Sequence, residues 1–440
     1  MDGQTIAALM FPAMFVLVFL GIPVAFSLII VGFVGALTLF GPLTPLQLFG
    51  RVLDVGNSYA LAAVPPFIFM GAMLERSGLA ERLFRAMQLW VGRLPGGLAL
   101  ATIMMGGIFA ATTGIVGAVE AIIGMMAIPT MLQYRYRHDL IAGTICAGGS
   151  LGTIIPPSVL AVVYASVGRI PVGDMLAAIA IPGVLMVAFF ILYILFRCLI
   201  RPDHGPPLSR EETDIPLAKK LRITATALLP ASALIAGVLG SILLGIASPT
   251  EAAGVGAAGA TLLTVLYGRF SLTLLADVLR RTVVVNAMIM LIVLGGTIFS
   301  SVFIIHGGAD LVRGIVEALA LGPAGMMALF LLIGFLLGFV LDWVSIVLIV
   351  LPIFDKLIRV AGIDPLWFGT MMIVVMQTSY LTPPMAPAIF YLRSVAPPQI
   401  TMEQMFVGVV PFVICQLLVL LMVALLPATA TWLPSTMTGF

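Results

Sequence analysis

The sequence predicts an all-α polytopic membrane protein made of two repeats with inverted topology. Its composition is the first reason: of 440 residues, 61% are hydrophobic and 9% are charged. A soluble domain carries about 25% charged residues, so the solvent of this chain is expected to be the lipid bilayer. One span needs roughly 20 apolar residues, which leaves room for about a dozen crossings. The net charge is only +2, so no nucleic-acid partner is expected.

An internal repeat is the second reason. Three proline landmarks recur in the same order in the two halves, at offsets of 223, 227 and 229 residues. The pairs are Pro129 with Pro352, Pro156-Pro157 with Pro383-Pro384, and Pro182 with Pro411. Each landmark alone is weak evidence. Together, their constant order and nearly constant offset indicate a duplicated unit.

The landmarks divide the chain into a first repeat at 1–200, a polar cytoplasmic linker at 201–221 and a second repeat at 222–440. Each repeat is expected to contain three spans, a re-entrant hairpin and two further spans, the first of them broken. The expected segments are scaffold spans in 1–75 and 222–305, hairpins at 98–129 and 323–354, and broken helices at 140–168 and 365–392. The mixed stretches 45–58 and 269–282 are predicted to be helices lying in the membrane interface.

The basic residues predict the orientation, because Lys and Arg concentrate on the cytoplasmic side. If both hairpins enter and leave on one face, 16 of the 21 Lys and Arg residues fall on one side and five on the other. The side with 16 is therefore assigned to the cytoplasm. The first hairpin then opens to the cytoplasm and the second to the opposite face, as in many secondary transporters with inverted repeats.

Two stretches should break helices inside the membrane, at 148–158 and 377–384. Proline cannot donate an amide hydrogen bond and clashes with the preceding turn, so a Pro-Pro pair forces an unwound segment. The carbonyl groups freed there are ready ligands for sodium, and the freed amides suit a carboxylate. A plain proline kink is the alternative, but two breaks at matched repeat positions favour a binding site.

The hairpin tips are the next candidates. Ala111-Thr112-Thr113-Gly114 is a small, hydroxyl-bearing turn, and Asp342 to Ser345 are its counterpart. An acid as deep in apolar sequence as Asp342 is a functional hypothesis by default, although it could also cap a helix. Glu120 has no acidic counterpart near Val350, so a packing or interfacial role is expected for it.

These arguments yield a set of candidate residues. The first sodium site is expected to use residues of the first tip and break: Thr112, Thr113, Gly114, Gly149, Ser150 and Gly152. The second is expected to use Asp342, Ser345, Thr378, Ser379 and Thr382. The substrate is expected to meet Ser150, Pro156, Thr382, Pro383 and Arg393. Arg393 could instead extend to the cytoplasmic interface, and His138, His204 and His306 are expected to be solvated or interfacial.

The absence of certain motifs argues against nucleotide binding and against a bound metal cofactor. No Gly-Lys dipeptide occurs, so there is no nucleotide-binding P-loop, and there is no His-Glu-x-x-His zinc motif. The three cysteines lie far apart in apolar runs without metal-site spacing. We therefore expect neither an enzyme nor a cofactor.

Several motifs resemble one known family, the large membrane subunit of tripartite ATP-independent periplasmic (TRAP) transporters. The resemblance covers nearly the whole chain. Its motifs are Leu-Gly-Ile-Pro-Val-Ala-Phe at 20–26, Leu-Pro-Gly-Gly-Leu at 94–98, GGSLGTIIPPS at 148–158, Gly-Phe-Val-Leu-Asp at 338–342, Gly-Ile-Asp-Pro-Leu-Trp-Phe-Gly at 362–369 and Leu-Thr-Pro-Pro at 381–384. The first hairpin tip and the second break look more like the branch for mannitol, chloroaromatic compounds and 2-oxo acids than like sialic acid transporters.

The resemblance implies a sodium-driven importer of an organic acid in the bacterial inner membrane. It implies an elevator mechanism, in which hairpins and broken helices move against a scaffold. It also implies two partners, a small membrane subunit and a periplasmic substrate-binding protein. The alternatives are a stand-alone anion exchanger or channel and, from another class, an intramembrane enzyme.

Overall fold

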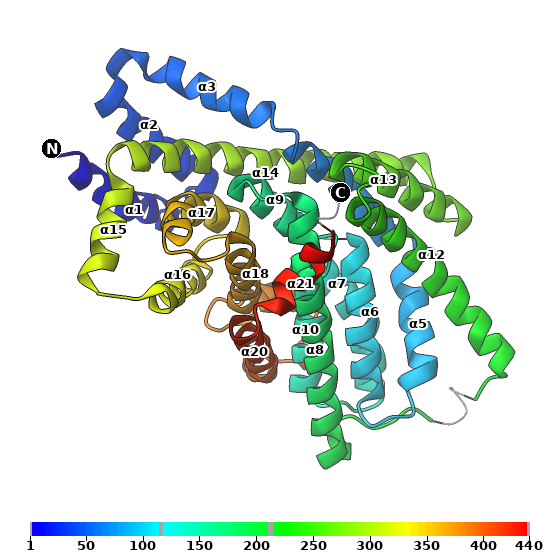
Figure 1. The fold of residues 1–440 in the computed structure, drawn as a ribbon. Helices are drawn as coiled ribbons and strands as arrows, with labels where there is room; N and C mark the ends of the chain where they lie inside the picture. Colours follow the sequence, from blue (N-terminus) through cyan, green and yellow to red (C-terminus); the bar gives the residue numbers. More distant parts are fainter. Residues whose placement is uncertain (1, 114–117, 210–213, 438–440) are drawn as a thin grey trace.

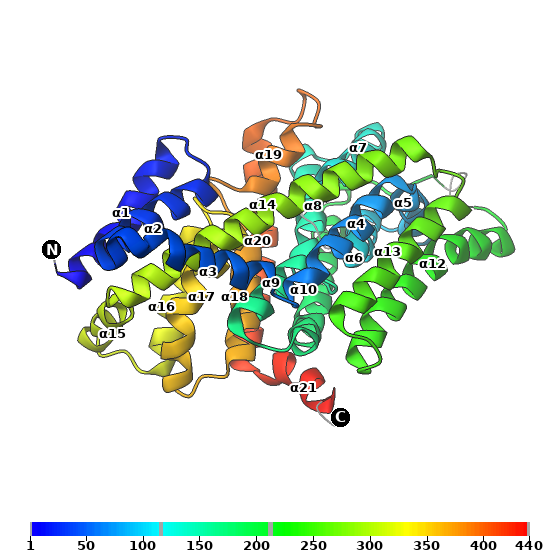
Figure 2. The same ribbon diagram turned by 90° about the horizontal axis from the view of Figure 1, so that it is seen from above.

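The fold is helical throughout the part of the chain that the structure describes. The computed structural model describes residues 2–113, 118–209 and 214–437, and no strand occurs among them. Figure 1 shows the helices coloured along the chain, and the two termini lie apart in both views (Figures 1 and 2). This confirms the predicted all-α class.

The helices of the first half set the pattern. They are α1 (Gly3–Phe19), α2 (Val24–Phe40), α3 (Thr44–Gly56), α4 (Val64–Arg76), α5 (Leu79–Val91), α6 (Gly97–Thr113), α7 (Ala118–Gln133), α8 (His138–Ser150), α9 (Val159–Gly168) and α10 (Val172–Ile200). Short 3-10 turns precede α3 and α4, follow α8 and lie at Pro202–His204. The helix pair α6 and α7 and the interrupted pair α8 and α9 occupy the regions expected for the hairpin and the broken helix.

The second half follows the same order. Its helices are α12 (Leu217–Leu243), α13 (Pro249–Leu266), α14 (Leu272–Ile305), α15 (Gly308–Ala318), α16 (Pro323–Leu337), α17 (Trp343–Val360), α18 (Pro365–Leu381), α19 (Pro387–Arg393) and α20 (Met402–Leu425), with α21 (Ala428–Met437) after them. Here α16 and α17 correspond to the hairpin, and α18 and α19 to the broken helix.

One expectation was wrong in the second half. Residues 269–282 were expected to form a separate interface helix, as α3 does in the first half. Instead, α14 runs without a break from Leu272 to Ile305. In the first half, Asn57 ends α3 and a turn precedes α4. The stretch around Thr282 holds no helix-breaking residue, so the second-half helix continues into the span.

Five helical stretches in the described residues are long and apolar enough to cross a membrane. They are Val24–Gly56, Val172–Ile200, Leu217–Leu243, Leu272–Ile305 and Met402–Leu425. The sequence has room for about a dozen crossings, and these five do not include the shorter apolar helices. The difference arises because breaks divide much of the remaining apolar sequence into helices of 10–17 residues.

The two halves exchange contacts around the interrupted helices. Helix α9 packs on α17 of the other half, and α19 packs on α7 and α8. Helix α8 also packs along α20. Each half-helix therefore lies on a hairpin arm from the opposite repeat, which brings both breaks to one region.

A second group of helices surrounds this region. Helix α14 runs across the width of the molecule in both views (Figures 1 and 2). It packs against α2 and α4, and α4 packs against α13. At 1.5 Å per residue, its 34 residues extend for about 51 Å, longer than the 30 Å apolar layer of a bilayer. It therefore must lie oblique to the membrane normal or extend beyond the apolar layer.

Candidate functional site

A cavity of about 610 Å³ lies where the two groups of helices meet. The interrupted helices contribute Thr153, Val159, Ser379, Tyr380 and Tyr391 to its wall, and the second hairpin contributes the segment 341–344. Helices α2, α4 and α14 form the other wall with mostly apolar side chains, among them Ala25, Phe26, Ile68, Ile289 and Ile292. The cavity thus joins both breaks to the surrounding helices.

The first break is held open by hydroxyl groups. Helix α8 ends at Ser150, and α9 begins only at Val159, after Pro156-Pro157. The Ser158 hydroxyl donates to the Thr153 carbonyl at 2.6 Å and accepts from the Ala161 amide at 3.5 Å. Ser158 therefore caps α9 and fixes the unwound segment at the same time.

The second break has a similar construction. Helix α18 ends at Leu381 and α19 begins at Pro387. The Thr382 hydroxyl donates to the Thr378 carbonyl at 2.6 Å, and the Ser379 hydroxyl donates to the Met376 carbonyl at 2.9 Å. Such bonds to the preceding turn are typical of Ser and Thr at bent helix ends.

A side-chain contact joins the two breaks. Gln377 Nε2 donates to Ser150 Oγ at 3.3 Å, across 227 residues of sequence. Both side chains are fully buried. The predicted sites of the two repeats are therefore neighbours in space.

Asp342 lies at the tip of the second hairpin and both caps α17 and faces the cavity. One carboxylate oxygen accepts from the amides of Val344 and Ser345 at 3.0 and 3.3 Å, and the other accepts from the Ser345 hydroxyl. Asp342 is also part of the cavity lining. The tip lies close to α18, because a β-carbon on Gly338 would meet Ser379 Oγ at 2.1 Å. Glycine at 338 is thus required for this approach.

The structure separates the predicted site residues into two groups. Asp342 and Ser379 line the cavity. The other described candidates belong to the same region but not to the lining: Gly149, Ser150, Gly152, Pro156, Ser345, Thr378, Thr382, Pro383 and Arg393. Arg393 ends α19 and donates to the Ile400 carbonyl at 3.2 Å. Gly114 and the side chains of Thr112 and Thr113 lie outside the described residues.

Several residues in this region were not among the predicted site residues, and three of them stand out. Tyr380 and Tyr391 line the cavity, and Gln377 joins the breaks. Polar side chains flanking a mid-membrane break are a usable signal, and an argument restricted to acids and to the hydroxyls of Ser and Thr misses Tyr and Gln.

Residues 148–152 also carry the Gly-x-Ser-x-Gly spacing of a hydrolase nucleophile elbow. The elbow requires a strand before the serine and a helix after it. Ser150 instead ends a helix, and its hydroxyl donates to the Ala147 carbonyl at 2.9 Å. The local structure therefore does not support a nucleophile.

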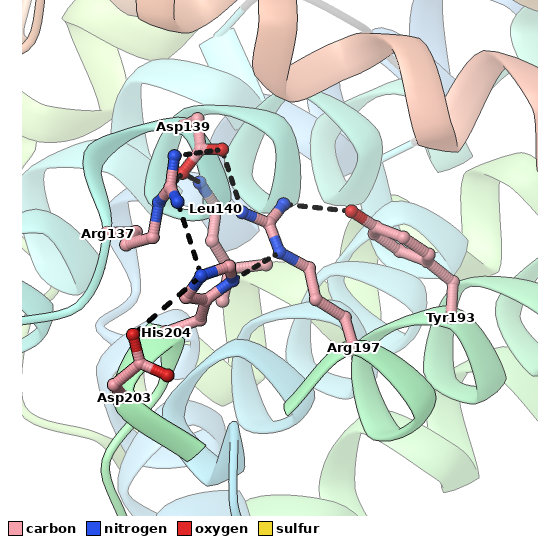
Figure 3. Close-up of polar contacts among 7 residues, drawn as sticks. All are labelled: Arg137, Asp139, Leu140, Tyr193, Arg197, Asp203 and His204. Carbon is pink, nitrogen blue, oxygen red and sulfur yellow. Dashed lines mark hydrogen bonds and ion pairs between the residues drawn. The ribbon is translucent and has the colours of Figure 1, made fainter. Parts of the chain in front are cut away.

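A cluster of charged side chains stabilises the start of α8 (Figure 3). Arg197 of α10 donates to Asp139 at 2.7 Å, to Tyr193 Oη at 2.9 Å and to His204 Nδ1 at 3.1 Å. Arg137 donates to the same carboxylate at 3.1 Å. The cluster ties the first broken helix to α10 and to the beginning of the linker.

Two of the histidines that were expected to be solvated or interfacial are buried in the protein. His204 and His306 are 5% and 6% exposed. His204 lies in the ionic cluster, and burial, followed by the guanidinium groups of Arg197 and Arg137, lowers its pKa. His306 lies within 3.1 Å of the Gly35 carbonyl. Polar partners from distant segments made these buried positions possible, and the sequence does not reveal those partners.

Comparison with known proteins gives the family. Residues 11–429 match the family model described as the DctM component of the tripartite ATP-independent periplasmic transporter. The chain is 29% identical to the sialic acid TRAP transporter large permease protein SiaM of Vibrio cholerae, over 96% of this chain and 97% of that protein. It is 30% identical to the C4-dicarboxylate TRAP transporter large permease protein DctM of Pseudomonas aeruginosa, over 92% and 93% of the two chains.

A solved structure shares the fold. The YdaH transporter of Alcanivorax borkumensis superposes with a TM-score of 0.60 over 90% of both chains, at 16% identity. The members of this family are inner-membrane transport components, which agrees with the long apolar helices of the chain. The family also argues against the alternative of an intramembrane enzyme. The chain therefore belongs to the DctM family, the large membrane permease component of tripartite ATP-independent periplasmic transporters.

Proposed function

We propose that this permease imports an organic acid by sodium-coupled secondary transport with an elevator motion. The cavity carries the proposal, because it joins both helix breaks to α2, α4 and α14. In the elevator, the two hairpins and the two broken helices move together. Helices α1 to α4 and α12 to α14 form the scaffold against which they slide.

The chemistry of the cavity supports a coupling cation. Asp342 places a carboxylate in a space otherwise lined largely by apolar groups. An organic anion would be repelled there unless a cation neutralised the carboxylate. Sodium is a hard cation that suits carboxylate, hydroxyl and backbone carbonyl oxygens, such as those at the tip and in the two breaks. We place one sodium in each repeat, among the candidate residues named above.

The direction of opening follows from the proposed topology. Residues 23–26, at the start of α2, and Tyr391, two residues before Arg393, line the cavity. The start of α2 and the end of α19 are both cytoplasmic in the topology that places 16 of the basic residues on the cytoplasmic side. The described conformation would therefore be open toward the cytoplasm.

Relatives support the substrate class and the partners. Their names include C4-dicarboxylate and isethionate, which are organic anions. The isethionate permease protein DctMQ of Oleidesulfovibrio alaskensis matches this chain over only 58% of its length, so it carries a further segment. We propose that a separate small membrane subunit serves this chain in that place, and that a periplasmic binding protein delivers a carboxylate or 2-oxo acid.

Uptake by the reconstituted complex tests the proposal. Proteoliposomes would hold this chain and the small subunit, with the periplasmic binding protein outside. Labelled succinate and pyruvate would be offered with and without a sodium gradient. We expect accumulation of one acid that requires sodium, the small subunit and the binding protein together. Full-rate uptake by the chain alone would instead establish a stand-alone exchanger or channel.

A further inference from the structure

A separate cavity of about 330 Å³ lies where α8 and α20 begin. It shares no lining residue with the cavity at the two breaks. In the proposed topology the segments 131–139 and 393–404 are both cytoplasmic, so this cavity opens on the cytoplasmic face. We call it the basic cavity, and its described lining consists of Arg135, Tyr136, Arg137, His138, Asp139 and Gln404.

Close packing of two helices places the basic cavity at the membrane surface. A β-carbon on Gly408 of α20 would collide with the Asp139 carbonyl oxygen, and one on Gly143 of α8 would collide with the Gly408 carbonyl. The first turns of the two helices are therefore neighbours. Helix α20 is one of the long apolar helices, so its start at Met402 marks the edge of the apolar layer. The basic cavity thus lies at the depth of the lipid headgroups.

Positive charge is in excess around the basic cavity. Asp139 is the one acid among the described lining residues. It is shared by Arg137 at 3.1 Å and Arg197 at 2.7 Å (Figure 3). Two guanidinium groups therefore surround one carboxylate, and Arg135 adds a further positive charge to the lining. The exposed acid Glu403 precedes Gln404 on α20 but is not part of the lining.

Hydrogen-bond donors are also in excess there. His204 Nδ1 lies 3.1 Å from Arg197 Nε, and His204 Nε2 lies 3.2 Å from Arg137 Nη1. A neutral imidazole accepts one hydrogen bond and an imidazolium accepts none, so at most one of these two contacts is a hydrogen bond. Arg197 is also held by Asp139 and Tyr193, and its side chain is 14% exposed, against 51% for Arg137. The surplus donor therefore belongs to Arg137, which lines the basic cavity.

We propose that the basic cavity binds a phosphate group, held by the guanidinium groups of Arg135 and Arg137. The planar fork of a guanidinium matches two oxygens of a phosphate, and a phosphate oxygen supplies the acceptor that Arg137 lacks. Basic pockets between membrane helices on the cytoplasmic side suit anionic headgroups. The phosphate belongs either to an anionic lipid or to free inorganic phosphate. This inference rests neither on the sodium sites nor on the transported acid.

The surface beside the basic cavity favours the lipid as the source. One turn after Gln404, α20 begins an exposed apolar stripe formed by Val407, Val410 and Ile414. A lipid with its headgroup in the basic cavity can lay an acyl chain along this stripe and bury apolar surface. Inorganic phosphate gains nothing from the stripe, so we expect it to bind more weakly than an anionic lipid.

Calorimetric titration of the purified chain in an uncharged detergent tests the site. The probes are short-chain phosphatidylglycerol, short-chain phosphatidylcholine and inorganic phosphate, all at constant ionic strength. We expect saturable binding of phosphatidylglycerol, weaker binding of phosphate and no saturable binding of phosphatidylcholine. Arg135→Gln should raise the Kd for phosphatidylglycerol about tenfold or more, because a contact between charged groups is lost. Arg222→Gln is the matched control: it removes an exposed arginine on α12 and should bind like wild type.

A second variant tests the geometry of the contact. Arg137→Lys keeps the charge but loses the fork, so it should also weaken phosphatidylglycerol binding, and an unchanged melting temperature would show that it is folded. Saturable binding of inorganic phosphate alone, lost in Arg135→Gln, would identify free phosphate as the ligand. Equal affinity for phosphatidylcholine would overturn the proposal, because the acyl chains and not the anionic group would then drive binding. Binding of neither anion, or an equal loss in Arg135→Gln and Arg222→Gln, would overturn it as well.

Discussion

The two repeats share their helix order but place their acids differently. In the first repeat, Glu120 is buried between α7 and Gly149. In the second, Asp342 lies at the hairpin tip and faces the cavity. The repeat therefore duplicates the scaffold for two helix breaks, and the two acids stand at nearly matched positions, nine residues before Pro129 and ten before Pro352, but in different surroundings. Similar folds in the two halves do not imply equivalent ion sites.

A second difference concerns the helices that face these breaks. The first repeat divides this region into α3 and α4, and the second spans it with α14 alone. The single helix gives the second hairpin a continuous partner: the Ser300 hydroxyl of α14 donates to the Leu348 carbonyl of α17 at 2.6 Å. This contact joins the proposed scaffold to the proposed mobile part.

The largest effect is expected from fixing that contact. Ser300→Cys with Leu348→Cys, joined by a short bifunctional thiol reagent, should abolish sodium-driven uptake because the second hairpin could no longer slide along α14. As a control, Gly168→Cys with Leu351→Cys joins α9 to α17 within the mobile part, where a β-carbon on Gly168 would lie 3.2 Å from Leu351 Cδ2. That pair should retain uptake. Retained uptake in the first pair would exclude an elevator motion at this interface.

The next effect concerns Asp342. Asp342→Asn keeps the helix cap, because Asn caps nearly as well as Asp, but removes the charge. A hydrogen bond or ligand contact to a charged group contributes about 1.5–3 kcal/mol, so the half-saturating sodium concentration should rise roughly 13- to 160-fold. Asp364→Asn is the matched control, since Asp364 caps α18 and is exposed. An unchanged sodium dependence in Asp342→Asn would restrict Asp342 to capping.

Much of the fold could be predicted from the sequence, for physical reasons. The low fraction of charged residues predicts a lipid environment, and a Pro-Pro pair in the interior of a helical run must interrupt the helix. The interrupted helices accordingly flank Pro156-Pro157 and Pro383-Pro384. The separate interface helix at 269–282 was not found, because an amphipathic face does not by itself end a helix.

The site was harder to predict, because it depends on contacts between repeats. Ser150 and Gln377 are 227 residues apart, and no local pattern pairs them. Glu120 was set aside because no acid lies near Val350, but counted from the matched prolines Pro129 and Pro352 its counterpart is Trp343, next to Asp342. Tyr391 lines the cavity because of the direction in which α19 leaves the second break, and the sequence does not predict that direction.

A smaller effect is expected at the two breaks. If the hydroxyls of Ser150 and Thr382 contribute to sodium binding, each change to Ala should raise the half-saturating sodium concentration about 2- to 13-fold, for a neutral bond of about 0.5–1.5 kcal/mol. Ser150→Ala should also lower the melting temperature, because Gln377 Nε2 loses its acceptor. Thr382→Ala should leave it nearly unchanged, since that hydroxyl bonds only within α18. Normal sodium dependence in both variants would leave backbone carbonyls as the ligands.

The smallest effect concerns the ionic cluster, which has no described counterpart at the start of α18. Burial and two guanidinium groups lower the pKa of His204 in the folded chain, whereas the pKa of a histidine in an unfolded chain is about 6.5. The unfolded chain therefore binds this proton at a higher pH than the folded chain. The free energy of unfolding gained by keeping His204 neutral is fully present above the pKa of the unfolded chain, about 6.5. It is lost as the pH falls from there toward the lower pKa of the folded chain.

Melting temperatures at neutral and mildly acidic pH measure this contribution. The fall on acidification should be larger in wild type than in His204→Gln, because glutamine cannot take up the proton. His138→Gln provides the control, because it removes the histidine at the start of the same helix α8 but leaves His204 in place, and it should behave like wild type. An equal fall in all three proteins would show that the cluster of Arg137, Asp139 and Arg197 tolerates a protonated His204. The contact between the linker and α8 would then not depend on pH.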